Sequence, residues 1–249
     1  MKIMYHMPQR IPFYILLVGL VFAPLVYAED QMAEERRVAY SALEQKNYKL
    51  AHILLTKLAK QGDVYANFNL AHMLETGKGT SIDIERAIAH YKFAFENGLL
   101  AAANNLGVIY ADGIAVEVSA ERAVYYYKLA ADQGNVRAQA NLAQLYLRGK
   151  IVPQDISIAN AYFTRAAMQN DVHSQYQLGV MYFKGDAVEK NIAEAYAWMS
   201  LAKENGDLQA QSVLEKLKPM FNRAELIAAE LRIAEIRQMI EKNLSNKYQ

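Results

Sequence analysis

Apolar residues recur every four positions within short segments of this chain, and the segments themselves recur every 36 residues. In one type of segment a small residue, a leucine and a larger apolar residue stand four apart: Ala66, Leu70 and Leu74, then Ala102, Leu106 and Tyr110, then Ala138, Leu142 and Tyr146, then Ser174, Leu178 and Tyr182. Residues four apart lie on one face of an α-helix, so each segment predicts an amphipathic helix, named helix A here.

A second type of segment follows each helix A and predicts a further helix, named helix B. Its apolar positions, spaced by four and three, are Ala87, Tyr91 and Ala94, then Ala123, Tyr127 and Ala130, then Ala159, Phe163 and Ala166, then Ala195, Met199 and Ala202. Small residues let neighbouring helices approach, and large ones fill the space between repeats. The pattern therefore predicts close packing between the two helix types.

The residues at the expected helix ends follow the same period. The B helices are preceded by residues whose side chains accept a hydrogen bond from an open backbone N–H: Asn47, Asp83, Ser119, Asp155 and Asn191. The A helices begin at Asp63, Leu99, Asn135, Asp171 and Asp207, of which Leu99 alone is a poor cap. The helices end at residues that tolerate the left-handed conformation, namely Gly62, Gly98, Gly134, Asn170 and Gly206 after B, and Gly77, Gly113, Gly149 and Gly185 after A.

This single period predicts a stacked array of helical repeats, because an isolated helix pair could not bury both of its faces. The expected parts after the first 28 residues are an N-terminal capping helix pair at 29–62, repeats at 63–98, 99–134, 135–170 and 171–206, and a C-terminal half repeat with a capping helix at 207–249.

The last segment contains a predicted long helix with two interpretations. Asn222 and Glu225 form a capping-box-like start. Apolar residues then follow at spacings of three and four: Leu226, Ala229, Ile233, Ile236 and Ile240. The helix either packs over the last repeat or forms a coiled-coil seam for a homodimer. We favour packing over the last repeat, because fewer than three heptads make a weak coiled-coil signal.

The first 28 residues have the features of an export signal. Lys2 and Arg10 provide a positive start, residues 13–26 are apolar, and small residues precede an expected cleavage site after Ala28. The apolar run is shorter than the roughly 20 residues needed to span a bilayer, so we expect cleavage and no membrane insertion afterwards. The expected location is the periplasm or the exterior of a bacterial cell.

Composition narrows the classes of function. The formal net charge of +1 is spread without a basic stripe, so nucleic acid is not an expected partner. Loss of residues 1–28 removes two basic side chains and no acidic one, which leaves a net charge of −1. The chain has no cysteine, so it has no disulfide, thiol nucleophile or cysteine zinc site. We expect no metal and no cofactor.

No motif points to catalysis. The segment 76–80 lacks the complete phosphate-binding loop motif, and its glycine Gly77 is explained as a helix terminator. Asp171, His173 and Ser174 are the residue types of a hydrolytic triad, but neighbours at one helix start cannot all converge on a nucleophile. The histidines occupy unrelated repeat positions. We therefore expect a protein that is not an enzyme.

The repeat pattern of this chain resembles that of a known family. The third repeat reads Ala138-x-x-Asn141-Leu142-Ala143-x-Leu145-Tyr146-x-x-Gly149, followed by Ala159-x-x-Tyr162-Phe163-x-x-Ala166-Ala167-x-x-Asn170. This pattern, over about residues 47–214, is similar to the Sel1-like repeat, a relative of the tetratricopeptide repeat. The resemblance implies a right-handed α-solenoid whose A helices line a concave groove, and it implies an adaptor or regulator that binds another protein or peptide.

The resemblance would place ten residues in that groove: Tyr65, Phe68, Asn69, His72, Asn104, Asn105, Arg137, Asn141, Tyr176 and Gln177. The amide column Asn69, Asn105, Asn141 and Gln177 would hold the backbone of an extended peptide, with aromatic residues as apolar anchors. The same amides would alternatively form a structural ladder between neighbouring helices, and the sequence leaves both interpretations open.

Two functions follow from these expectations. The first is a protein-binding adaptor of the bacterial cell envelope. The second is a peptidoglycan- or glycan-binding accessory protein, or a component of a cell-wall hydrolase, in which Tyr65, Tyr176 and the amide column form a sugar-binding strip.

Overall fold

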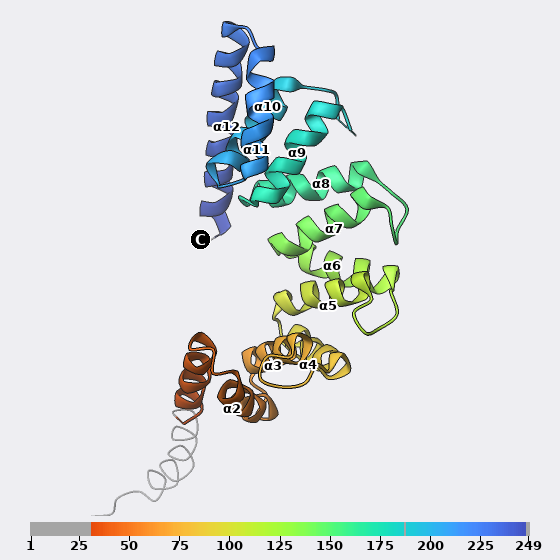
Figure 1. The fold of residues 1–249 in the computed structure, drawn as a ribbon, viewed down its shortest axis with the longest axis vertical. Coiled ribbons are helices and arrows are strands. Elements are labelled where there is room, and N and C mark those ends of the chain that lie inside the picture. Colours follow the sequence, from red (N-terminus) through yellow and green to blue (C-terminus); the bar gives the residue numbers. More distant parts are fainter. Residues whose placement is uncertain (1–30, 187, 248–249) are drawn as a thin grey trace, which may run out of the picture. The chain divides into compact units, whose positions relative to one another are not determined.

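The computed structural model describes residues 31–186 and 188–247, and all regular structure in these ranges is helical (Figure 1). Residues 31–44 form the first described helical segment. The following helices are α2 (Tyr48–Lys60), α3 (Val64–Thr76), α4 (Ile84–Glu96), α5 (Leu100–Asp112), α6 (Ala120–Asp132), α7 (Val136–Arg148), α8 (Ile156–Ala167), α9 (Val172–Lys184), α10 (Ile192–Glu204), α11 (Leu208–Leu217), the short 3-10 helix η1 (Lys218–Met220) and α12 (Arg223–Lys247). The predicted all-α class of two-helix repeats is confirmed.

The contacts divide the chain into two compact units, residues up to Phe93 and residues from Ala94 onward. In the first unit α2 packs against α3. The helical segment 31–44 adds buried Ala39 and Ala42, and it is tied to α2 by an ion pair between Glu35 and Lys57 at 2.6 Å. Arg36 of the same segment forms an ion pair with Asp63. These contacts fit the expected helix at the N-terminal end of the array.

In the second unit consecutive helices from α5 to α11 pack on one another. The pairs are α5 with α6, α6 with α7, α7 with α8, α8 with α9, α9 with α10 and α10 with α11, and Figure 1 shows them following one another in chain order. The B-helix positions predicted as apolar, such as Tyr127, Phe163 and Met199, are at most 4% exposed. The core of each repeat is therefore completed by its neighbours.

The predicted helix ends are confirmed along the chain. Asp155 Oδ1 accepts a hydrogen bond from the Ile158 N–H at 2.9 Å, and every other predicted B-helix cap makes the equivalent bond. Four of the five A helices are capped in the same way. Leu99 makes no such bond, because its side chain has no hydrogen-bond acceptor. Asn170 adopts a φ of 67°, so it closes α8 in the conformation that glycine provides elsewhere.

Helix α12 lies along α10 (Figure 1). The amide N–H of Asn222 donates to Glu225 at 2.8 Å, and Asn222 accepts from the Glu225 N–H, which completes the predicted capping box. Ile233, Ile236 and Ile240 are buried in one cluster with Trp198 of α10. The predicted apolar stripe is thus packed within the chain, as we favoured. A homodimer through this helix stays a prediction.

The expected export signal, residues 1–28 with cleavage after Ala28, lies outside the described residues. None of the described helices combines the length and the hydropathy that a bilayer crossing requires.

Gly107 of α5 marks a close approach between two helices. A β-carbon at this position would lie 2.5 Å from the Tyr127 ring, which is itself buried on α6. The equivalent positions of other repeats hold Ala71, Ala143 and Gly179, and a β-carbon at Gly179 would lie 2.4 Å from the Met199 side chain. Glycine is therefore required in the two repeats in which a large B-helix side chain lies against this position.

We predict that Gly107→Ala lowers the free energy of unfolding by about 1–3 kcal/mol, because the added methyl group must displace a buried ring. Denaturant unfolding followed by circular dichroism measures this loss. Ala143→Gly is the matched control at the same repeat position, with an expected cost of about 0.5–1 kcal/mol from backbone entropy alone. A Gly107→Ala protein as stable as the natural one would show that the ring moves freely.

Candidate partner-binding site

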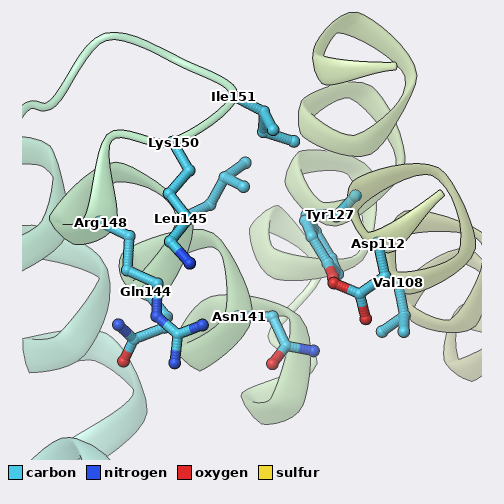
Figure 2. A pocket seen from close by; sticks show the side chains of 10 residues that line it. Val108, Asp112, Tyr127, Asn141, Gln144, Leu145, Arg148, Lys150 and Ile151 are labelled. Atoms are coloured by element: carbon cyan, nitrogen blue, oxygen red, sulfur yellow. The ribbon is translucent and has the colours of Figure 1, made fainter. Parts of the chain in front are cut away.

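The surface of α5 and α7 in the second unit contains a pocket of about 330 Å³ (Figure 2). It lies at the ends of two A helices, because Asp112 is the last residue of α5 and Arg148 is the last residue of α7. The loop after α7 adds further residues. The lining consists of Val108, Ala111, Asp112, Tyr127, Asn141, Gln144, Leu145, Arg148, Lys150 and Ile151.

The two sides of this pocket differ in charge. Figure 2 shows Arg148, Lys150 and Gln144 on one side, and Asp112 with the Tyr127 hydroxyl on the other. Burial raises the pKa of Tyr127, and the negative charge of Asp112 raises it further, so the phenol stays protonated at neutral pH. Within the described residues neither Arg148 nor Lys150 forms an ion pair. The pocket therefore combines two unpaired cations with one carboxylate.

Amide side chains connect the A helices around the pocket. Asn141 Nδ2 of α7 donates to Asn104 Oδ1 of α5 at 2.9 Å, and Asn104 Nδ2 donates to Asn105 Oδ1 at 3.3 Å. The bridge between repeats thus runs from Asn141 to Asn104 and not along the predicted column. Asn104 is only 5% exposed, so it stabilises the contact between α5 and α7 and offers little surface to a partner.

A second polar connection joins α7 to α9. Gln144 Oε1 lies 3.3 Å from His173 Nε2, and that nitrogen lies 3.5 Å from the Gln177 amide. The predicted residue Gln177 therefore reaches the pocket region through His173. The predicted residue Arg137 is exposed on α7, one turn before Asn141.

Tyr176 was predicted as an aromatic anchor in the groove. Among the predicted residues of the second unit, its position is the least suited to that role. Its ring is partly buried against a cluster that includes Met199 of α10 and Leu214 of α11. The ring fills space between repeats. A groove-facing aromatic would instead leave one ring face open.

The first unit contains the other four predicted groove residues. Tyr65 is 61% exposed, and with Asn69 it lines a hollow of about 630 Å³ on α3. Asn69 donates to the Tyr65 carbonyl oxygen of its own helix at 2.9 Å, and His72 lies 3.6 Å from Glu75, also on α3. The Phe68 ring packs edge-on against Tyr91 at 5.5 Å. Of these four, Tyr65 exposes the most apolar surface.

Sequence reasoning missed a set of buried amides that stands two positions before the predicted column. Gln139 Nε2 donates to the Ala131 carbonyl oxygen of α6 at 2.9 Å, and its Oε1 accepts from Gln169 at 2.8 Å. Gln175 repeats the arrangement, with Ala167 and Asn205 as partners. In the first unit Asn67 donates to Ala59 and contacts His90 Nδ1 at 2.8 Å.

These buried amides donate a further hydrogen bond to carbonyl groups at the end of the preceding B helix, which also accept from backbone N–H groups of the turn that follows. The period of 36 residues relates Asn67, Gln139 and Gln175, but Ala103 interrupts the column. Polar residues inside a helix also usually indicate solvent exposure. For both reasons the column was not recognised from the sequence.

The described part of the chain contains no cluster of three or more histidine, cysteine or carboxylate side chains that could hold a metal ion. Burial lowers the pKa of His90, and the nearby Arg86 lowers it further, so this histidine is neutral at pH 7 and bound to Asn67. It contributes to packing of the first unit.

Comparisons with known proteins agree with this architecture. The family model for the Sel1 repeat matches residues 37–63, 64–99, 100–135, 136–171 and 172–207. A Sel1 repeat protein of known structure from Oxalobacter formigenes is 35% identical, with a TM-score of 0.61, over 68% of this chain and 49% of that protein. This chain thus spans about half the length of that relative.

A sel1 repeat protein of known structure from Klebsiella pneumoniae subsp. pneumoniae is 22% identical, with a TM-score of 0.50, over 75% of this chain and 93% of that protein. This likeness concerns the fold. A search of curated proteins finds no match.

We predict that Gln139→Leu lowers the free energy of unfolding by about 1–3 kcal/mol, because it removes a buried amide that serves both Ala131 and Gln169. Thermal unfolding measures the change. Gln144→Leu, on the same helix but at the surface, is the control and should change stability by less than about 0.5 kcal/mol. Equal effects of the two substitutions would contradict a structural role for the buried amide.

Proposed function

Because this chain belongs to the Sel1 repeat family, whose members generally mediate protein–protein interaction, we propose that it is an adaptor that binds a partner protein on the surface of α5 and α7. The observation that carries this proposal is the pocket between these helices, where charged and amide side chains remain available to a partner.

The available groups suit a polypeptide ligand. Gln144 retains an amide group that can donate hydrogen bonds, and Arg148 and Lys150 provide cations. Val108, Leu145 and Ile151 add apolar surface beside them. Specific protein contacts combine an apolar centre with a few directed polar groups, and this pocket provides both at small scale.

We place this adaptor in the bacterial cell envelope. The support is the sequence of residues 1–28, which has the charge, apolar run and small residues of a cleaved export signal. The absence of cysteine is compatible with folding after export. Comparison of the mature N-terminus with residue 29 tests this part of the proposal.

An adaptor is preferred to a glycan-binding protein or a hydrolase component. Sugar sites need aromatic rings with an open face. Of the two rings of the expected sugar-binding strip, Tyr65 is 61% exposed, but Tyr176 is packed against other residues. The Sel1 repeat scaffold is typically non-catalytic. We therefore propose a binding function without catalysis.

A photo-crosslinking residue placed at Gln144 tests the binding surface directly. Exposure of the protein to an envelope extract from its own cells should give a specific crosslinked protein from position 144. The matched control is the same residue at Lys128, which is exposed on α6 and lies outside the pocket lining. Crosslinks from position 128 alone, or from neither position, would contradict the proposed surface.

A further inference from the structure

The pocket on α5 and α7 has more positive than negative charge. Arg148 and Lys150 line it from the end of α7 and the loop that follows, and Asp112 lines it from α5. These groups give the pocket a net charge of +1, although the whole chain is nearly neutral. The excess positive charge is therefore a feature of the pocket and not of the whole chain.

Asp112 does not neutralise either cation. Within the described residues Asp112, Arg148 and Lys150 form no ion pair with one another or with any other side chain. Figure 2 places Asp112 beside the Tyr127 hydroxyl, across the pocket from Arg148 and Lys150. The α9 side contributes His173, which lies against Gln144 and adds no negative charge.

Helix ends explain part of this arrangement. A cation in the last turn is stabilised by the helix dipole, and Arg148 is the last residue of α7. The helix dipole corresponds to about half a charge, so it does not neutralise two cations. It also does not satisfy their hydrogen-bond donors. The Leu147 carbonyl is already bound by Gln154 at 2.8 Å. Donors of Arg148, Lys150 and Gln144 remain for another ligand.

We propose that this pocket binds a carboxylate group of the partner protein, with Arg148 and Lys150 as its ion partners and Gln144 as a hydrogen-bond donor. This inference rests on the proposed function and adds the chemistry of the ligand. Arginine matches a carboxylate through two parallel N–H donors, and such charge-assisted bonds are stronger than neutral ones.

The net charge of the pocket favours a carboxylate over a phosphate group. One carboxylate carries a single negative charge and neutralises the pocket. A phosphate group carries about 1.5–2 negative charges at pH 7, and Asp112 would repel it. The size of about 330 Å³ also suits a side chain or chain terminus, since it lies at the small end of ligand pockets.

Titration of the isotope-labelled protein with short peptides tests this proposal by NMR. The probes are acetyl-Gly-Glu-Gly-amide, acetyl-Gly-Gln-Gly-amide and acetyl-Gly-Gly-Gly with a free carboxylate. We expect saturable shifts at Gln144 and Arg148 with at least one carboxylate peptide and none with the glutamine peptide. The two carboxylate probes distinguish an acidic side chain from a chain terminus.

Arg148→Gln should weaken binding of the carboxylate peptide about tenfold, as expected from loss of one charge-assisted hydrogen bond. Lys128→Gln is the matched control, because Lys128 is exposed on α6 and lies outside the pocket lining. Equal weakening by both substitutions, equal binding of the glutamine peptide, or tighter binding of inorganic phosphate would overturn the proposal. The crosslinking result at Gln144 is independent of these outcomes, so failure here leaves the adaptor function standing.

Discussion

The repeats of this protein depend on burial of apolar side chains against neighbouring repeats. In the second unit the helices from α6 to α10 have packing partners on both sides, and the alanine columns allow the backbones to approach. Full burial of one large apolar side chain contributes about 1.5–3 kcal/mol, so a ring such as Phe163 accounts for a large share of the stability of its repeat. An isolated helix pair would lose this contribution on its exposed face.

Close stacking also requires that the polar groups at helix ends find partners. Capping side chains satisfy the N–H groups at helix starts, and buried amides such as Gln139 and Gln175 add a hydrogen bond to carbonyl groups at the ends of B helices. Arg148 and Lys150 take no part in these bonds, and within the described residues they have no ion partner. They remain available at the surface of α5 and α7.

Most of the local structure could be predicted from the sequence, because one period relates residues with the same physical role. Asn170 illustrates this, since its position in the glycine column predicted the positive φ that it adopts. The candidate site was harder to predict. Asn141 was predicted either to face the groove or to belong to a ladder between neighbouring helices, and its bond to Asn104 depends on how two repeats are placed side by side. Lys150 and Ile151 belong to a loop, and no periodic pattern indicates that they close a pocket.

Hydrogen exchange of the Phe163→Ala protein, read helix by helix by mass spectrometry, tests most directly whether stability is passed between neighbouring repeats. Removal of this buried ring from α8 should cost about 3–5 kcal/mol. If neighbouring repeats stabilise one another, protection will fall most in α7, α8 and α9, and α2 and α3 will keep their natural protection. An equal loss of protection in all helices would instead show that the chain unfolds as one cooperative core, and would contradict this account.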